Sequence, residues 1–258
     1  MTSADILAVL SGSVVGLVLA LIGGGGSILA TPALLYIVGV ANPHTAIGTS
    51  ALAVSVNAFA NLVSHARSGN VKWNCALVFA VAGVAGAAIG AAVGKLTDPA
   101  VLLPLFAVLM IVVGAAMLIP RKAALESHVR LDARNAPRLV AYGLGAGALS
   151  GFFGIGGGFL IVPGLVAATG MSMLEAIGSS LVSVGSFGAT AAVSYAADGL
   201  VDWRIAALFI TGGVGGGLIG AAFATRLARQ RGLLQRVFAA IVFAVAGYML
   251  YRSLIAPH

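Results

Sequence analysis

The stretch GGGGSILATP, from Gly23 to Pro32, returns later in the chain as GIGGGFLIVP, from Gly154 to Pro163. Three further matches follow in the same order: AIGTS (46–50) with AIGSS (176–180), SHARSGNVKW (64–73) with SYAADGLVDW (194–203), and Gly83, Gly86 and Gly90 with Gly213, Gly216 and Gly220. The offset is 131 residues and then 130. Apolar composition alone does not produce four such matches in one order, so we predict that the chain is a duplication.

The composition indicates a lipid environment. Of the 258 residues, 60% are hydrophobic and only 8% are charged, and the mean hydropathy is +1.09. A soluble domain carries roughly 25% charged residues, so we predict an integral membrane protein without a soluble domain. Met1 to Asp5 carry no basic cluster and no small-residue cleavage site follows, so a cleaved signal peptide is not expected.

Each half holds five hydrophobic segments, which predicts an all-α polytopic membrane protein. They lie at roughly 5–22, 27–39, 45–65, 73–94 and 99–119, and at roughly 138–153, 159–170, 175–196, 203–224 and 233–255. The third and fourth segments of each half are about 20 residues long, or about 30 Å as helices, which suffices to span a bilayer. The second segment is shorter, so the first two segments of each half are predicted to form a short or broken helical hairpin with a Gly-rich tip. We expect a first membrane repeat at 1–119, a basic linker at 120–137 and a second repeat at 138–258.

The basic residues change sides between the two halves. If the central linker is cytoplasmic, all but three of the fourteen Lys and Arg residues lie inside, and those three are Lys95, Arg204 and Arg252. The positive-inside rule therefore predicts inverted-topology repeats, with a cytoplasmic linker and both termini outside. The net charge of +7 is then explained by cytoplasmic loops, and no nucleic-acid partner is expected.

The glycine runs point to function. Inverted repeats with interrupted helices are typical of secondary transporters, which bind substrate near the midplane. Free backbone N–H groups at helix starts bind anions, and glycine lets the backbone approach a ligand closely. The predicted substrate-binding residues of this kind are Gly23, Gly24, Gly25, Gly26, Ser27, Gly154, Gly156, Gly157 and Gly158.

Two alternatives stay open at these runs. The helix after the first run is capped either by Ser27 or by Thr31, with Pro32 in the first helical position. The glycines themselves serve either a ligand or tight helix packing. A later set of glycines in the fourth segment is spaced by three and four residues: Gly83, Gly86, Gly90 and Gly94. For this set we predict helix packing, which is the usual role of small residues in membrane helices.

Polar residues near the third segments are further substrate-binding candidates. Hydroxyls can donate to an anion without the desolvation cost of a charge, or they can bond back to a helix carbonyl. Four open the third segments: Thr49, Ser50, Ser179 and Ser180. Asn57 lies further along the segment that contains Thr49 and Ser50, and it faces either the substrate or other helices.

Two ionisable residues just before the third segments, His44 and Glu175, are candidates for proton coupling, unless they lie solvated at the interface. The single cysteine, Cys75, lies in an apolar run and is interpreted as a core residue. We find no nucleotide-binding motif, no metal-ligand cluster and no catalytic set, so neither a cofactor, a metal nor enzyme activity is expected.

Together these motifs resemble the TauE/SafE sulfite exporter family, also called the 4-toluene sulfonate uptake permeases, from about Ser13 to Leu250. The resemblance rests on the paired GxGGGxLxxP-like loops and the AxGTS-like segments after them. The first loop departs slightly, with Ser27 in the place of Gly158 and Gly24 in that of Ile155. The family implies an inner-membrane transporter of sulfite, sulfonates or related organosulfur anions, whose two inverted halves bring their hairpins together centrally. It also implies that both glycine loops and the four hydroxyls belong to the site.

We therefore expect a secondary transporter that works by alternating access, with a small anion and the lipid bilayer as its partners. A homo-oligomer stays open. The alternatives are a passive small-anion channel and a membrane interaction protein without transport.

Overall fold

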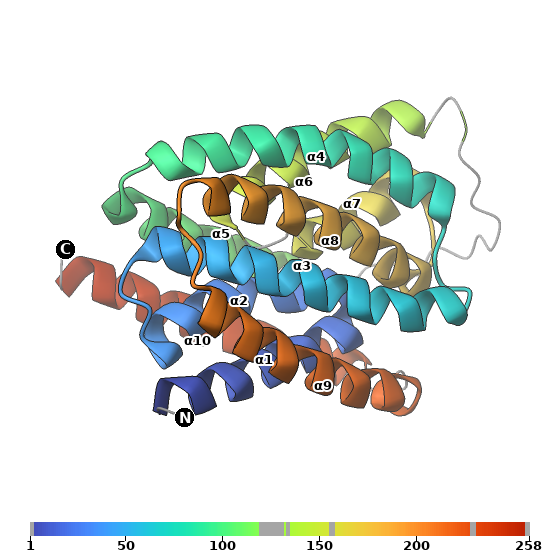
Figure 1. Cartoon of the computed structure of the whole chain (residues 1–258). Helices are drawn as coiled ribbons and strands as arrows, with labels where there is room; N and C mark the ends of the chain where they lie inside the picture. The colour runs from blue at the N-terminus through green and yellow to red at the C-terminus, as the bar shows by residue number, and fades with distance from the viewer. Residues whose placement is uncertain (1–2, 119–131, 133–134, 155–157, 228–230, 256–258) are drawn as a thin grey trace.

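The computed structural model describes residues 3–118, 132, 135–154, 158–227 and 231–255, which form helices and short connections without any strand (Figure 1). The first half contains α1 (Ser3–Ile22), the 3₁₀ helix η1 (Gly23–Leu29), α2 (Ala30–Pro32), the π-helix η2 (Ala33–Val38), α3 (Pro43–Arg67), α4 (Trp73–Leu96) and α5 (Pro99–Leu118). The second half contains α6 (Ala136–Phe153), α7 (Gly158–Thr169), α8 (Met173–Ala197), α9 (Trp203–Leu227) and α10 (Arg231–Ile255). The all-α prediction is confirmed for these residues.

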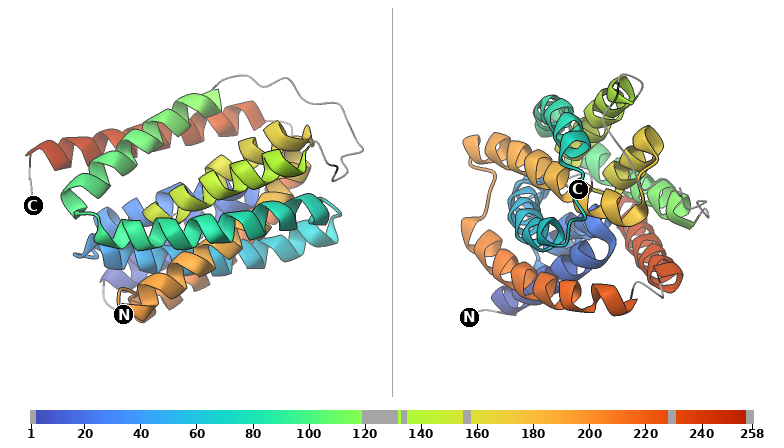
Figure 2. Two further views of the ribbon diagram at one scale, coloured as in Figure 1. Left: turned by 90° about the horizontal axis from the view of Figure 1, so that it is seen from above. Right: turned by 90° about the vertical axis from the view of Figure 1, so that its right-hand side faces the viewer.

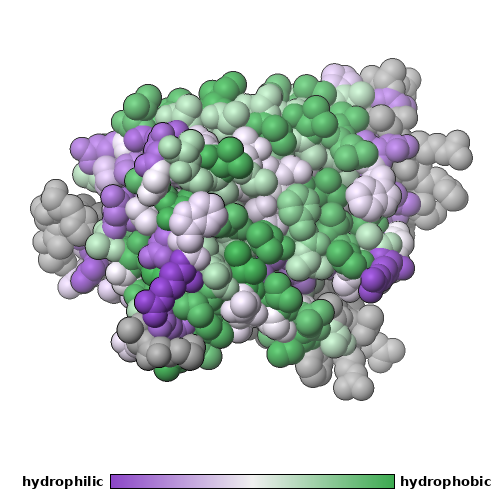
Figure 3. Space-filling model, viewed as in Figure 1, coloured by the Kyte–Doolittle hydropathy of each residue, from purple (hydrophilic) through white to green (hydrophobic). Residues whose placement is uncertain are grey.

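Five helices in the described residues are long and apolar enough to cross a membrane: α3, α4, α8 and the stretches Ser3–Leu21 of α1 and Trp203–Gly220 of α9. Hydrophobic side chains cover the middle of the face shown in Figure 3, and hydrophilic ones gather toward the two ends of the helices. This distribution suits a protein whose helices cross a bilayer. Figure 1 shows that α1 begins and α10 ends at the same end of the molecule.

The main helix contacts join one half of the chain to the other. Helix α1 packs along α9, and α4 packs along α6. The third helices, α3 and α8, pack on each other in the centre (Figure 1). The last helices, α5 and α10, lie side by side along one side of the molecule (Figure 2).

Glycines set the close approach in the first two of these pairs. A Cβ on Gly16 of α1 would overlap the backbone of Gly213 of α9, and one on Gly147 of α6 would overlap Gly83 of α4. These two contacts occupy equivalent positions in the two halves, since Gly16 corresponds to Gly147 and Gly213 to Gly83.

The four later glycines of the first half pack as predicted. A Cβ on Gly86, Gly90 or Gly94 would press on backbone atoms of α6, and one on Gly83 would overlap the ring of Phe187. The prediction that this set serves helix packing is confirmed.

The first glycine run is helical rather than unwound. Gly23–Leu29 forms the 3₁₀ helix η1, which packs against α1, α7 and α8. A Cβ on Gly26 would lie 2.5 Å from the backbone nitrogen of Leu19, so this turn of chain fits against α1 only as glycine. Neither predicted cap residue begins a helix here, because Ser27 lies inside η1 and Thr31 lies inside α2, whose N-cap is Leu29.

Within the described part of the chain, three ion pairs connect the halves at the helix ends. Asp5 pairs with Arg204 (2.8 Å) and Lys95 pairs with Asp198, while Lys72 pairs with Glu175 (2.9 Å). The pair of Asp5 and Arg204 lies where α1 and α9 begin, and the pair of Lys95 and Asp198 lies where α4 and α8 end. The third lies at the opposite end, where α4 and α8 begin. Each end of the bundle is therefore held by charge contacts between the halves.

Candidate functional site

The two halves meet at a buried hydroxyl cluster around Ser50 of α3. The Ser50 Oγ lies 2.9 Å from the carbonyl oxygen of Ile47, 3.3 Å from that of Gly154 and 2.8 Å from the Thr31 Oγ1. Ser50 has a single proton for these three oxygens, and either hydroxyl can donate in its contact with Thr31. This cluster links the segment after the first glycine run, the third helix and the start of the second glycine run.

Gly154 has the geometry that this contact requires. It ends α6 with φ +63°, a left-handed conformation that favours glycine, and its N–H donates to the carbonyl of Ser150. A Cβ at this position would overlap the Ile47 side chain of α3. The second glycine run therefore begins in direct contact with the third helix of the first half.

The remaining glycine candidates are placed only in part. Gly23, Gly24 and Gly25 lie in η1 with Gly26 and the fully buried Ser27. Gly158 begins α7, and η1 packs against α7. Gly156 and Gly157 lie outside the described residues.

Thr49 and Ser179 have matching partners across the two halves. The Thr49 Oγ1 of α3 accepts from the backbone N–H of Asp202 at 2.9 Å, and the Ser179 Oγ of α8 accepts from that of Lys72 at 2.9 Å. Asp202 and Lys72 are the residues that precede α9 and α4. Both hydroxyls therefore position the start of a fourth helix from the opposite half, a contact that neither sequence interpretation anticipated.

Ser180 is bonded to its own helix. Its hydroxyl donates to the carbonyl of Ile177 at 2.8 Å, as that of Ser50 does to Ile47. Unlike Ser50, Ser180 makes no hydrogen bond to the opposite half among the residues that the structure describes. The two sites are thus alike in local geometry and different in their neighbours.

Asn57 is fully buried on α3 at the junction with α9. A Cβ on Gly213 would overlap its amide, and both the Nδ2 and the Oδ1 atoms lack a hydrogen-bond partner among the described residues. Asn61, one turn further, donates from its Nδ2 to the carbonyl of Asn57 at 2.9 Å. Asn57 thus lies against another helix, as one interpretation expects, and its binding of substrate stays a prediction.

The two candidates for proton coupling lie at the starts of the third helices, at opposite ends of the bundle. The backbone N–H of His44 donates to the Asn42 side chain that caps α3, and its ring stacks near Tyr195. Glu175 forms a capping box with Ser172 at the start of α8 and pairs with Lys72. Their role in coupling stays a prediction.

A sequence profile described as "Sulfite exporter TauE/SafE" matches residues 8–249, which include both glycine runs and both third helices. This chain belongs to the TauE/SafE sulfite exporter family. The resemblance stated from the sequence motifs is thereby confirmed.

Relatives of this TauE/SafE protein are similar over most of its length. A "Probable membrane transporter protein" of Xylella fastidiosa (strain Temecula1) is 54% identical over 244 residues, or 94% of each chain. The "Probable membrane transporter protein YdhB" of Bacillus subtilis is 28% identical over 242 residues, which cover 91% of this chain and 95% of that one. No solved structure matches this chain significantly. The family and the names of the relatives support a membrane transporter rather than an enzyme.

Sequence reasoning missed several buried polar side chains of this TauE/SafE protein. Ser150 of α6 and Ser183 of α8 are fully buried, and their hydroxyls have no partner among the described residues. The sequence suggests only a helix-capping role for the hydroxyl of Thr31. The sequence match between the halves does not reveal them, because the positions that align with Ser150 and Ser183 hold the apolar Leu19 and Ala53.

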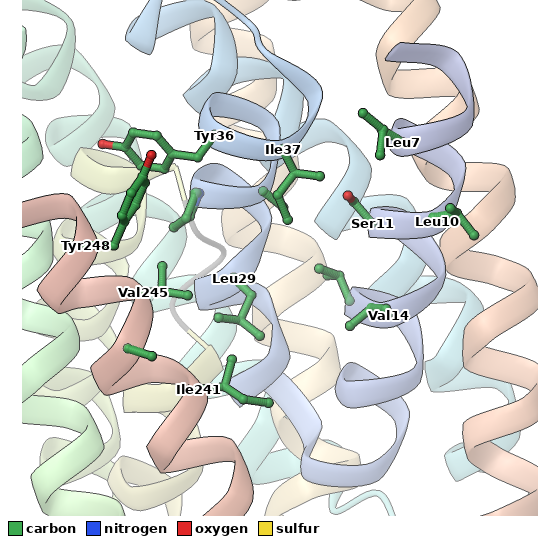
Figure 4. Close-up of a pocket in the computed structure, with 14 residues that line it drawn as sticks. Leu7, Leu10, Ser11, Val14, Leu29, Tyr36, Ile37, Ile241, Val245 and Tyr248 are labelled. Carbon is green, nitrogen blue, oxygen red and sulfur yellow. The ribbon is translucent and has the colours of Figure 1, made fainter. Parts of the chain in front are cut away.

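A cavity of about 620 Å³ lies on the side of the bundle, between α1, the η1–η2 segment and α10 (Figure 4). Its lining is apolar apart from the hydroxyls of Ser11, Tyr36 and Tyr248. The apolar lining residues are Leu7, Leu10, Val14, Val15, Leu29, Pro32, Ala33, Ile37, Ile241, Ala244 and Val245. Leu10, Val14 and Ile37 are more than half exposed, so the cavity opens toward the surface that would face lipid. It contains none of the predicted site residues.

The described residues contain no group of three or more His, Cys, Asp or Glu side chains that could hold a metal ion. Cys75 is buried in α4, in keeping with its interpretation as a core residue.

Proposed function

We propose that this chain is a secondary transporter that moves small sulfur-containing anions, such as sulfite, sulfonates or related organosulfur compounds, across the inner membrane by alternating access. The substrate is held centrally between the halves by the two Gly-rich segments. The halves are inverted repeats whose first two segments form Gly-tipped hairpins. The central linker is cytoplasmic and both termini are outside.

The observation that carries this proposal is the equivalence of contacts between the halves. Thr49 accepts a hydrogen bond from the residue before α9, and Ser179 accepts one from the residue before α4. The corresponding residues of the two pairs are 130 positions apart, which is the offset of the duplication. At the crossing of α3 and α8, the Ser55 hydroxyl donates to the carbonyl of Gly185, its own equivalent, at 2.8 Å. Such matched contacts support two halves related by a pseudo-two-fold axis, the architecture of many secondary transporters.

The central cluster supports the position of the site. Ser50 joins Thr31 of the first half to Gly154 of the second, and η1 packs against α7. The Ser150 hydroxyl, one turn before Gly154 on α6, is buried without a partner among the described residues, and a neutral donor of this kind suits an anion in a low-dielectric environment. The choice of sulfur anions rests on the description of the family.

The experiment that tests the transport activity uses purified protein in liposomes. A thermal-stability screen with sulfite, sulfate, thiosulfate, sulfoacetate, taurine, phosphate and chloride first identifies a ligand, since a ligand at 100 times its Kd stabilises the fold by about 2.7 kcal/mol. Uptake of that ligand should saturate and should be accelerated by unlabelled substrate on the other side. Flux without such acceleration would indicate the anion channel instead, and absence of flux would favour the interaction protein.

A glycine pair tests the position of the site. Gly154→Ala introduces strain at positive φ and overlap with Ile47, whereas Gly170→Ala introduces the strain (φ +71°) with no atom within 4 Å of the new Cβ. We expect Gly154→Ala to reduce substrate binding and uptake well beyond Gly170→Ala in folded protein. Equal uptake by the two variants would place the substrate elsewhere.

A further inference from the structure

Three polar side chains follow one face of α3. Asn57, Asn61 and His65 are spaced by one helical turn and are 0%, 5% and 8% exposed. Asn57 and Asn61 lie against α9, where a Cβ on Gly213 would overlap the Asn57 amide and one on Gly217 would lie 2.7 Å from the Asn61 Oδ1. Glycines in α9 therefore leave the space that the two amides occupy. Figure 1 shows α9 running beside α3.

Asn61 donates to the carbonyl of Asn57, but three other polar atoms on this face have no such partner. Both amide atoms of Asn57 and the Nδ1 of His65 are buried without a hydrogen-bond partner among the described residues. Leaving a buried donor or acceptor unpaired costs about 1–3 kcal/mol, so such atoms normally bind water or a ligand. In this conformation α9 lies directly against the two amides and leaves the unpaired atoms no accessible surface. Water or a ligand would therefore reach them when α9 separates from α3.

The equivalent face of α8 is different. The offset of 130 residues places Phe187, Ala191 and Tyr195 at the positions of Asn57, Asn61 and His65. The Phe187 ring stacks on Phe79, and Ala191 is fully buried. The Tyr195 hydroxyl also lacks a partner, but two apolar residues separate it from the middle of the helix. The polar face therefore exists in one half only, and the duplication does not require it.

We propose that Asn57, Asn61 and His65 line a hydrated path for small anions, which leads along α3 from the middle of the protein to the end of the helix at Arg67. This inference rests on the proposed transport function and adds a route on one side of the membrane. Amide N–H groups bind an anion without carrying a charge of their own. The exposed Arg67 at the mouth raises the local concentration of anions.

A pair of cysteine variants tests the path. In a Cys75→Ala background, Asn61→Cys and the matched Ala191→Cys are reacted in liposomes with a membrane-impermeant methanethiosulfonate that carries a sulfonate group. Because reaction needs access of the reagent to the thiolate, we expect Asn61→Cys to react at least about tenfold faster than Ala191→Cys. Similar rates, or a faster Ala191→Cys, would overturn the proposal.

The side of entry is tested in the same background. Ser68→Cys lies on the exposed turn after α3 and marks the membrane side at which the path should open. Asn61→Cys should react from that side alone, and reaction from the opposite side would overturn the path. If Asn61→Cys does not fold, His65→Cys and Tyr195→Cys form the replacement pair, with the same expected difference.

The labelling experiment and the transport assay test the path and the transport function independently. A wild-type protein without flux whose Asn61→Cys variant reacts rapidly would refute the transporter but keep the hydrated path. A transporting wild type whose two cysteine variants react equally slowly would refute the path alone.

Discussion

The hydroxyl oxygen of Thr49 on α3 accepts a hydrogen bond from the backbone N–H of Asp202, 153 residues further along the chain, at 2.9 Å. The equivalent pair, Ser179 and Lys72, makes the same bond at the same distance. Each bond ties the third helix of one half to the start of the fourth helix of the other. Any motion between the halves must therefore either carry these pairs as units or break them.

Removing the Thr49 acceptor should destabilise the protein. Thr49→Val keeps the shape of the side chain but leaves the N–H of Asp202 without its partner, at a cost of about 1 kcal/mol or more. Thr190→Val is the matched control, because the Thr190 hydroxyl only donates to the carbonyl of Ser186 in its own helix. Thermal unfolding in detergent should show the larger decrease for Thr49→Val. Equal decreases would mean that the contact between the halves contributes nothing measurable.

The glycine contacts between α4 and α6 should tolerate no methyl group. Gly147→Ala drives a Cβ into the backbone of Gly83, and such overpacking costs about 1–3 kcal/mol or more. Gly145→Ala, two residues away on the same helix, meets no atom within 4 Å and should be neutral or slightly stabilising. The yield of monodisperse protein and its unfolding temperature compare the two. A stable Gly147→Ala would show that α4 and α6 can separate without loss of fold.

The coupling role of Glu175 can be separated from its structural role. If Glu175 carries a coupling proton, Glu175→Gln should abolish the acceleration of uptake by a pH gradient. Its stability should change by no more than about 1 kcal/mol, because the ion pair with Lys72 is partly exposed. Asp198→Asn removes a comparable pair, with Lys95, at the other end of the bundle and should keep the pH dependence. Persistent pH dependence in Glu175→Gln would exclude this residue from coupling and leave His44.

Cys75 should report on unfolding. Its side chain is buried in α4, so a membrane-impermeant thiol reagent should not react with the native protein. On heating, the reaction should begin at the temperature at which the helical signal is lost. Rapid reaction at room temperature would show that α4 opens locally in the native state.

Much of the fold can be predicted from the sequence, because helix formation in a membrane depends on local composition. Long apolar runs predict α3, α4, α8 and α9, and the regular glycine spacing predicts the packing face of α4. The first glycine run is different. Its sequence allows an open loop as well as a helix. In the structure it forms a 3₁₀ helix, and Gly26 of this helix packs directly on the backbone of α1.

The sequence by itself predicted a duplication, and it determined that the chain is a helical membrane protein that resembles the TauE/SafE family. These properties follow from composition, spacing and motifs, which need no knowledge of distant contacts. Only the tertiary structure decided which hydroxyls bond across the halves and which polar atoms stay unpaired. Thr49 and Ser50 are neighbours with similar side chains, yet one holds the start of α9 and the other meets Thr31 and Gly154. A hydrogen bond depends on the distance and angle to a partner far away in the chain, and the packing of helices alone sets that geometry.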